Sequence, residues 1–391
     1  VNHPPILSPP SPLDVNELLD HTISFLTPSA ADLISCALVA RSWVDPAQSH
    51  LFRVPHDRNF GYNIARSIAV SLFRTLSEKP PLARHVREFR LCLPLHVDTA
   101  LLELLQGIQF TKLQTLDIVY FRMESIPFPE PFAQLFTMNS LKQLRMYFDV
   151  PPSPSLMRVM QSSSRTIQHL DLVSTQGLGD FPSTLEQAIQ IPLKSLRLNC
   201  RMEYDPHPTT LKSLSPFGLS ELKALAIRGG DIAPWRLIET KNIPVLKISN
   251  VPSNKRTPVD LSQLSNLSIL RIKFLLIVPP TIFKTLATMV SSHRIHTIFV
   301  YFEDYMDLVR FGEGSQEGDL SLCEELDQVL SSLPLDPLPS VEVEVEADKE
   351  IVQNSFPRLV AKQMLRIIPF AGYNGQLSWW QVCKLVRMKL G

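Results

Sequence analysis

Histidine and glutamate side chains supply the few places in this chain where residue type and spacing could support chemistry. His293 and His296 stand three apart, a spacing that can bring two imidazoles to one metal ion, but no third ligand stands near them in the sequence. Glu342, Glu344 and Glu346 alternate with valines, which indicates one solvated face of a strand rather than a carboxylate pair for acid–base work. We therefore expect no metal, no cofactor and no catalytic activity.

Short catalytic motifs and a charge excess are also missing from the sequence. It has no GxxxxGK(S/T) or GxGxxG phosphate loop, no HExxH zinc motif and no GxSxG nucleophile turn. Lys+Arg and Asp+Glu both number 38, which gives no support for binding to nucleic acid. No apolar run reaches the ~18 residues that a membrane span needs. The five cysteines are scattered without a CxxC pair, which is typical of reduced thiols in a cytoplasmic or nuclear protein.

A six-residue unit, apolar-x-x-apolar-x-apolar, recurs through most of the chain and predicts a series of strands. Its middle residues are Phe89, Leu116, Leu144, Leu170, Leu196, Leu225, Leu246, Leu270, Ile298 and Val341. The first nine follow one another at steps of 21 to 29 residues, and the tenth follows after 43. A period of roughly 20–29 residues is typical of leucine-rich repeats, in which each unit contributes one strand and stacks on its neighbours.

Helical stripes such as Leu320–Leu330 lie between many of these units. Each unit therefore indicates a strand, a turn, a helix and a turn, and it can bury its apolar face only by stacking. We predict an α/β fold, a curved solenoid with a parallel β-sheet on its concave face. A polar loop at 311–319 explains the long last step. We expect a closing helix at Leu359–Ile368, and the basic, aromatic segment 372–391 is either an end cap or a partner-binding tip.

Alternation along the predicted strands turns the spaced leucines inward and the residues between them outward. The outward positions that could grip a client protein are Arg145, Tyr147, Arg197, Arg228, Lys247, Arg271, Lys273, Phe299 and Tyr301. From Arg197 onward this face is basic, and it becomes aromatic at Phe299. One hypothesis is that it binds an acidic or phosphorylated segment of a client, with the aromatic residues as anchors. The alternative is an ordinary solvated sheet face.

Residues 13–52 carry a helical periodicity instead. A first apolar stripe ends at Thr27-Pro28, and Ser29 stands three residues before Asp32, as in a helix N-cap. We expect a third helix to begin with Asp45 as N-cap and Pro46 at its first position. Three short helices bury too little surface to be firmly stable alone, so their apolar faces need a partner.

The run LDVNELLDHTISFLTPSAADLISCALVARSWVDPAQSHLF, residues 13–52, resembles an F-box across all three helices. In that family the module binds a Skp-type adaptor and, through it, a cullin ubiquitin ligase. The resemblance implies these contact or supporting residues: Leu13, Leu18, Leu19, Ile23, Leu26, Leu33, Val39 and Trp43. Some of them must instead form the core of the module, because one helix stripe cannot face two ways. Trp43 is the expected anchor, since large aromatic residues dominate interface hot spots.

The expected organisation is an F-box at 12–54, a linker helix at 55–82, nine or ten irregular repeats at 83–348 and a helical cap or tail at 349–391. By this interpretation the chain is a non-catalytic, substrate-recruiting subunit of a ubiquitin ligase, and it acts by proximity. The first alternative is a leucine-rich-repeat scaffold whose F-box serves assembly without ubiquitination. The second is an enzyme with an unrecognised site.

Overall fold

The computed structural model describes about three fifths of the chain, and everything below concerns that part. The described residues are 16–26, 29–53, 62–93, 99–120, 130–148, 159, 163, 165–174, 191–200, 217–218, 221–229, 243–249, 260–274, 280–291, 293–302, 318–345 and 349–369. Residues 311–317 of the predicted loop at 311–319, the tail at 372–391 and Leu13 lie outside them, and the last two residues of that predicted loop are helical instead. The chain forms two compact units, Val1–Met146 with Ser162–Thr166, and Tyr147–Gln161 with Ile167–Gly391.

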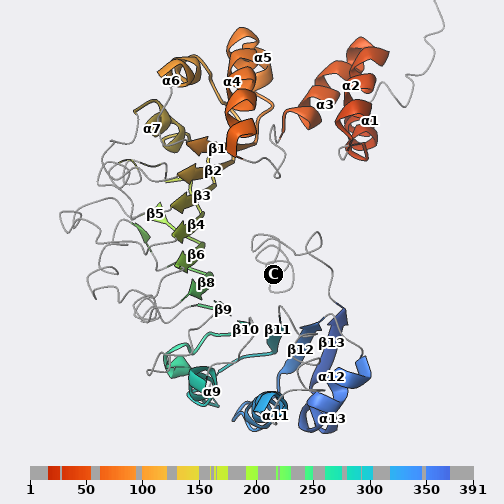
Figure 1. The fold of residues 1–391 in the computed structure, drawn as a ribbon, viewed down its shortest axis with the longest axis vertical. Coiled ribbons are helices and arrows are strands. Elements are labelled where there is room, and N and C mark those ends of the chain that lie inside the picture. The colour runs from red at the N-terminus through yellow and green to blue at the C-terminus, as the bar shows by residue number, and fades with distance from the viewer. Residues whose placement is uncertain are drawn as a thin grey trace, which may run out of the picture. The chain divides into compact units, whose positions relative to one another are not determined.

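The first unit begins with three short helices, α1 (Asn16–Ser24), α2 (Ala30–Val39) and α3 (Arg41–Leu51) (Figure 1). The Ser29 hydroxyl accepts the backbone N–H of Asp32 at 3.2 Å, so the predicted cap of α2 is confirmed. It satisfies one of the N–H groups that a helix start leaves without an intrahelical acceptor.

The predicted start of the third helix is wrong. The helix α3 begins at Arg41 with Ala40 as N-cap, and Pro46 lies inside it. The N–H of Trp43 donates to the carbonyl of Ala40 at 3.0 Å, and the Trp43 ring packs against the core of the module. This packing holds the residues before Asp45 in helical form, and the Asp45 carboxylate is used elsewhere.

The helix α4 (Tyr62–Glu78) and the short α5 (Pro80–Ala83) lead into the sheet, as the predicted linker helix requires. Phe73 of α4 is fully buried, and its ring centroid lies 5.4 Å from that of Phe89 on the first strand. The ring centroid of Phe110 lies 5.2 Å from that of Phe89. Three aromatic rings in tilted contact therefore close the sheet core at this end, and such pairs add to the energy of burial itself.

Eleven strands form a parallel sheet in the order β1-β2-β3-β4-β6-β8-β9-β10-β11-β12-β13. The first three are β1 (Glu88–Leu93), β2 (Thr115–Tyr120) and β3 (Gln143–Phe148), and the boundary between the two units falls within β3. The others are β4 (His169–Ser174), β6 (Ser195–Cys200), β8 (Ala224–Gly229), β9 (Val245–Ser249), β10 (Ile269–Phe274), β11 (Thr297–Phe302), β12 (Ser340–Val345) and β13 (Leu365–Pro369). All ten predicted units coincide with strands, and sequence order equals sheet order, as in a solenoid-like α/β fold. A separate two-stranded sheet pairs β5 (Ile191–Pro192) with β7 (Phe217–Gly218).

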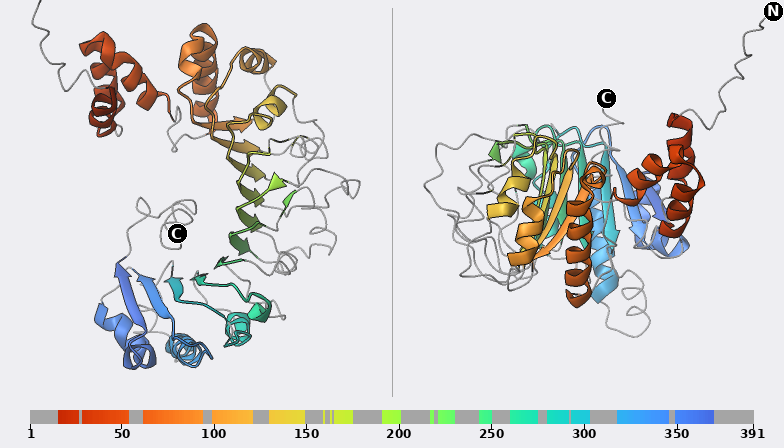
Figure 2. Two further views of the ribbon diagram at one scale, coloured as in Figure 1. Left: turned by 180° about the vertical axis from the view of Figure 1, so that it is seen from behind. Right: turned by 90° about the horizontal axis from the view of Figure 1, so that it is seen from above.

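Helices cover one face of the sheet within each unit (Figures 1 and 2). In the first unit they are α6 (Thr99–Gln106) and α7 (Glu130–Phe136), and in the second α9 (Pro280–Leu286), α11 (Gly318–Ser331), α12 (Lys349–Ser355) and α13 (Pro357–Ala361). The apolar residues of the repeated unit are buried, as the alternation predicts, except Leu338 of the tenth unit, which is 46% exposed. Among the described residues, no helix combines the length and the apolar character that a membrane crossing requires.

A recurring backbone joint connects each strand to the unit before it. The N–H groups of Gln114 and Thr115 both donate to the carbonyl of Arg87, at 2.7 and 2.9 Å. The same joint recurs at the carbonyls of Gln114, Gln168, Lys194 and Pro244, each of which accepts two consecutive N–H groups. At the start of the sheet, Arg87 and Glu88 donate to the carbonyl of Arg53, just after α3.

The last strand was not predicted. Residues 365–369 form β13, where we expected the end of a helix, and the observed helix α13 (Pro357–Ala361) overlaps the predicted one only at residues 359–361. Gln363 has a φ of 56°, which ends the helix, and the β-branched Ile367 and Ile368 favour a strand. The strand pairs in parallel with β12, with Val341 opposite Leu365.

Candidate functional site

The helical module has a small core of its own. Leu19, Ile23 and Leu33 are buried together, and Leu26, Trp43 and Leu51 pack partly against them. Of the eight residues that the resemblance implies for adaptor binding, five therefore pack inside the module: Leu19, Ile23, Leu26, Leu33 and Trp43. The ring of Trp43 supports the module and is half-buried.

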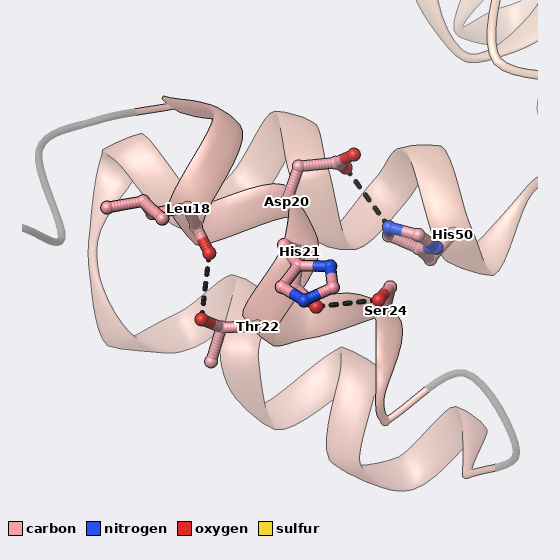
Figure 3. A network of polar contacts seen from close by, with 6 residues as sticks. All are labelled: Leu18, Asp20, His21, Thr22, Ser24 and His50. Carbon is pink, nitrogen blue, oxygen red and sulfur yellow. Dashed lines mark hydrogen bonds and ion pairs between the residues drawn. The ribbon is translucent and has the colours of Figure 1, made fainter.

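Polar contacts fix α1 within this module (Figure 3). His50 Nε2 of α3 lies 3.0 Å from Asp20 Oδ1 of α1. Thr22 Oγ1 donates to the carbonyl of Leu18 at 2.7 Å, and Ser24 Oγ donates to the carbonyl of His21 at 2.6 Å. Both are local bonds from a hydroxyl to a carbonyl three or four residues earlier, and only the carbonyl of His21 lies in the last turn of α1, where intrahelical partners are missing.

A second set of apolar side chains on α1, the turn after it and α2 faces outward. Their exposed fractions are 50% for Leu18, 71% for Phe25, 51% for Ile34, 83% for Leu38 and 65% for Val39. By contrast Leu33, which is also on α2, is 2% exposed. Exposed apolar residues scattered singly are ordinary, but here five occur between Leu18 and Val39, and each keeps apolar area in contact with water at a cost in free energy. We call these five residues the module surface.

Sequence reasoning found two members of the module surface, Leu18 and Val39, and missed Phe25, Ile34 and Leu38. The sequence does carry an indication of them. The apolar residues of α2 are spread over opposite faces of the helix instead of forming a single stripe. A short helix with this pattern is expected to be covered on both faces. One side of α2 faces the module core.

A cluster of polar groups joins α3 to the segment before β1. Asp45 Oδ1 lies 3.1 Å from Arg84 Nη2 and 3.3 Å from His85 Nε2. The His85 side chain is buried, and its burial lowers its pKa below the usual value; Asp45 opposes this shift, while Arg84, Lys112 and Arg87 add to it. We call Asp45, Arg84 and His85 the junction cluster.

The outward face of the sheet carries ion pairs between neighbouring strands. In the first unit Arg90 Nε lies 3.8 Å from Asp117 Oδ2. In the second, Arg197 Nη1 lies 3.2 Å from Asp171 Oδ2. The predicted client-binding residue Arg197 therefore has a carboxylate beside it, and its charge is partly neutralised. Arg145 and Tyr147 stand on β3 and are half-buried, and the side chain of Arg228 lies outside the described residues.

The expectation that Glu342 lies on a solvated strand face is wrong. Its side chain is buried, and its Oε1 lies 3.4 Å from Nη1 of Arg366 on β13. The error follows from the missed strand, because the partner of Glu342 stands on an element that we expected to be helical.

The remaining predicted residues come together on β9, β10 and β11. In register, Lys247 stands beside Arg271, Arg271 beside Phe299, and Lys273 beside Tyr301. The Arg271 guanidinium carbon lies 4.0 Å from the centre of the Phe299 ring, and Lys273 Nζ lies 4.8 Å from the centre of the Tyr301 ring. The two aromatic residues therefore hold cations by cation–π contact. We call these five residues the cation row.

No protein-family model and no curated protein matches this chain. The fold and the surfaces described above are therefore the basis on which function is argued.

Two histidines that could have indicated chemistry have structural contacts. His293 is buried, its Nε2 donates to the carbonyl of Leu261 at 2.8 Å, and its Nδ1 accepts the N–H of Val290 at 3.0 Å. His169 Nδ1 lies 2.7 Å from Ser195 Oγ, but both side chains are buried, and the pair is a cross-strand hydrogen bond. Within the described ranges, no three His, Cys, Asp or Glu side chains gather as a metal site would require.

Proposed function

We propose that this chain is the substrate-recognition subunit of a Skp/cullin/F-box type ubiquitin ligase. Its helical module, α1 to α3, would be the F-box, and its sheet would be a leucine-rich-repeat array that holds a client protein. The chain itself would be non-catalytic. It would raise the effective concentration of the client near the activated ubiquitin.

The module surface is the single observation that carries this proposal. The helices already satisfy their own core with Leu19, Ile23 and Leu33, so the outward apolar residues are not needed to hold the module together. Leu38 is 83% exposed, and burying a leucine side chain against a partner contributes about 2 kcal/mol. A docking partner is the simplest reason for a small domain to keep this surface.

Charge reversal on the module surface tests the proposal. The full chain carrying Leu38→Glu should bind a purified Skp-type adaptor at least about tenfold more weakly, because an apolar pocket does not accept an unpaired carboxylate. Its melting temperature should stay that of the unchanged protein, since the side chain is exposed. Ser71→Glu, which adds the same charge at an exposed position of α4, is the matched control and should bind normally.

Equal adaptor binding by Leu38→Glu and the control would refute the docking role. Co-purification distinguishes the ligase hypothesis from the alternative of a scaffold that assembles without ubiquitination. A ligase subunit captures cullin together with the adaptor, whereas the scaffold captures the adaptor alone.

A further inference from the structure

The last strand of the sheet differs from the others in how well its inward side chains are covered. In each strand from β1 to β12, the middle and last apolar residues of the repeated unit are at most 3% exposed. At β13 the same two positions hold Leu365 and Ile367, opposite Val341 and Val343 in the register. Both are only half-buried. The two buried apolar columns of the sheet therefore come into contact with water at its last strand.

The first strand shows what closes such a column. Phe73 of α4 is fully buried, and its ring contacts that of Phe89 on β1, which is 1% exposed. Among the described residues, no strand stands beyond β13 in the sheet and no helix follows it along the chain (Figure 1). The terminal unit of a repeat array cannot bury its apolar face alone and needs a cover. We therefore expect a further element to pack against β13.

The open edge of β13 presents backbone donors as well as side chains. The N–H of Val341 donates to the carbonyl of Met364 at 2.8 Å. In a parallel ladder this pattern directs the N–H groups of alternate β13 residues toward β12, and it leaves those of Leu365 and Ile367 on the open side. A helix would cover only the two side chains. A strand would bury these side chains and also accept the two N–H groups, so a strand is the better match.

The chain carries one more copy of the repeated unit after β13. Residues 383–388, Cys-Lys-Leu-Val-Arg-Met, have the pattern apolar-x-x-apolar-x-apolar. Their middle residue, Val386, stands 21 residues after Leu365, which equals the shortest step between neighbouring units of the array. Another match to the pattern, centred on Trp380, follows Leu365 by only 15 residues, which is shorter than every step in the array. Spacing therefore selects residues 383–388 as the segment that can reach the open edge in register.

We propose that residues 383–388 dock on the open edge of β13 as its parallel neighbour, with Val386 opposite Leu365 and Met388 opposite Ile367. The side chains of Val386 and Met388 cover the two half-buried residues, and Leu385 lies on the outward side. A segment of the same chain is present at a high effective concentration, so neither a second copy nor a client has to supply the cover. The inference does not rest on the proposed function. It removes the strand edge as a place for a client and leaves the outward face of the sheet.

Hydrogen–deuterium exchange, measured by mass spectrometry on the purified full chain, tests this docking. The amides of residues 364–368 should exchange as slowly as those of β12. Val386→Glu should speed their exchange at least about tenfold, because an apolar core does not accept an unpaired carboxylate. Leu385→Glu makes the same change one residue earlier, on the outward side, and should alter the rate less than about twofold.

Two further measurements keep the test decisive. Met388→Glu should repeat the effect of Val386→Glu, and the exchange of β1 should stay unchanged in every variant, which shows that the rest of the chain is folded. Equal effects of Val386→Glu and Leu385→Glu, or no effect of either, would overturn the proposal. So would protection of residues 364–368 that increases with protein concentration, because a second copy would then be the cover. Adaptor capture by these variants should remain normal, so the ligase proposal and this inference can fail separately.

Discussion

Asp327, on α11, accepts the backbone N–H of Leu359 at 2.9 Å although its side chain is fully buried. It also accepts the N–H of Arg358 at 2.9 Å, so one carboxylate caps the start of α13. Lys362 Nζ donates to the carbonyl of Ser331 at 2.7 Å and joins the same two helices again. The end of the repeat array is thus held by a buried charge that is satisfied by backbone groups.

Asp327→Ala should lower the free energy of unfolding by about 3 kcal/mol, because two buried N–H groups lose a charged acceptor. Asp327→Asn should cost less, since the amide oxygen still accepts one N–H. Chemical denaturation measures both, and Glu324→Ala, an exposed position on the same helix, is the control. A loss from Asp327→Ala no larger than that of the control would contradict the capping role.

The junction cluster should make stability depend on pH. The folded state holds the pKa of His85 below its usual value of about 6.5, whereas the unfolded chain takes up the proton at that value. Below about pH 6.5 the unfolded state therefore binds more protons, and stability should fall as the pH drops toward the folded pKa. Denaturation at about pH 7.5 and about pH 5.5 should show this loss, and His85→Gln should reduce it.

Asp45→Asn tests the same cluster in the opposite direction. Asp45 raises the pKa of His85, so its removal should lower that pKa further and extend the loss of stability to more acidic pH. The exposed ion pair with Arg84 adds little by itself, since such pairs contribute about 0–1 kcal/mol. If His85→Gln keeps the full pH dependence of the unchanged chain, the titrating group lies elsewhere.

The buried carboxylate of Glu342 should make Arg366 matter more than its exposure suggests. Arg366→Ala should cost about 1 kcal/mol, because a buried charge loses its partner while the arginine itself remains largely in water. The same change in a Glu342→Gln background should cost less than half as much. A double-mutant cycle by thermal denaturation measures the difference. Equal costs in both backgrounds would mean that the two side chains do not interact.

The sequence predicted the strands well because each of them repeats one local rule. The middle apolar residues of ten units, from Phe89 to Val341, are all buried, and a single period was enough to find them. The eleventh strand was missed because its unit lacks the first apolar residue. By the register of β12 with β13, Lys362 stands where that residue would be, and the segment was predicted to be helical instead.

Contacts between elements could not be predicted in the same way. Asp45 has the sequence context of an N-cap, but in the structure it contacts Arg84 and His85, which lie about 40 residues later. The outward face was predicted as basic from Arg197 onward, yet Arg197 lies beside the carboxylate of Asp171 on the neighbouring strand. Such differences depend on which side chains tertiary packing brings within 4 Å of each other, and periodicity carries no information about that.

The backbone joint at Arg53 bears on how the repeat array can be isolated. The carbonyl of Arg53 accepts the N–H groups of Arg87 and Glu88 at the start of the first strand, as a carbonyl of the preceding unit does for later strands. A shortened chain that starts after Arg53 would leave these donors bare at the rim of the sheet, where a strand from another molecule could pair with them. Precipitation of such a fragment would reflect these unpaired N–H groups at the edge of the sheet. A truncation that isolates the repeat array from the helical module therefore has to keep Arg53 with the array.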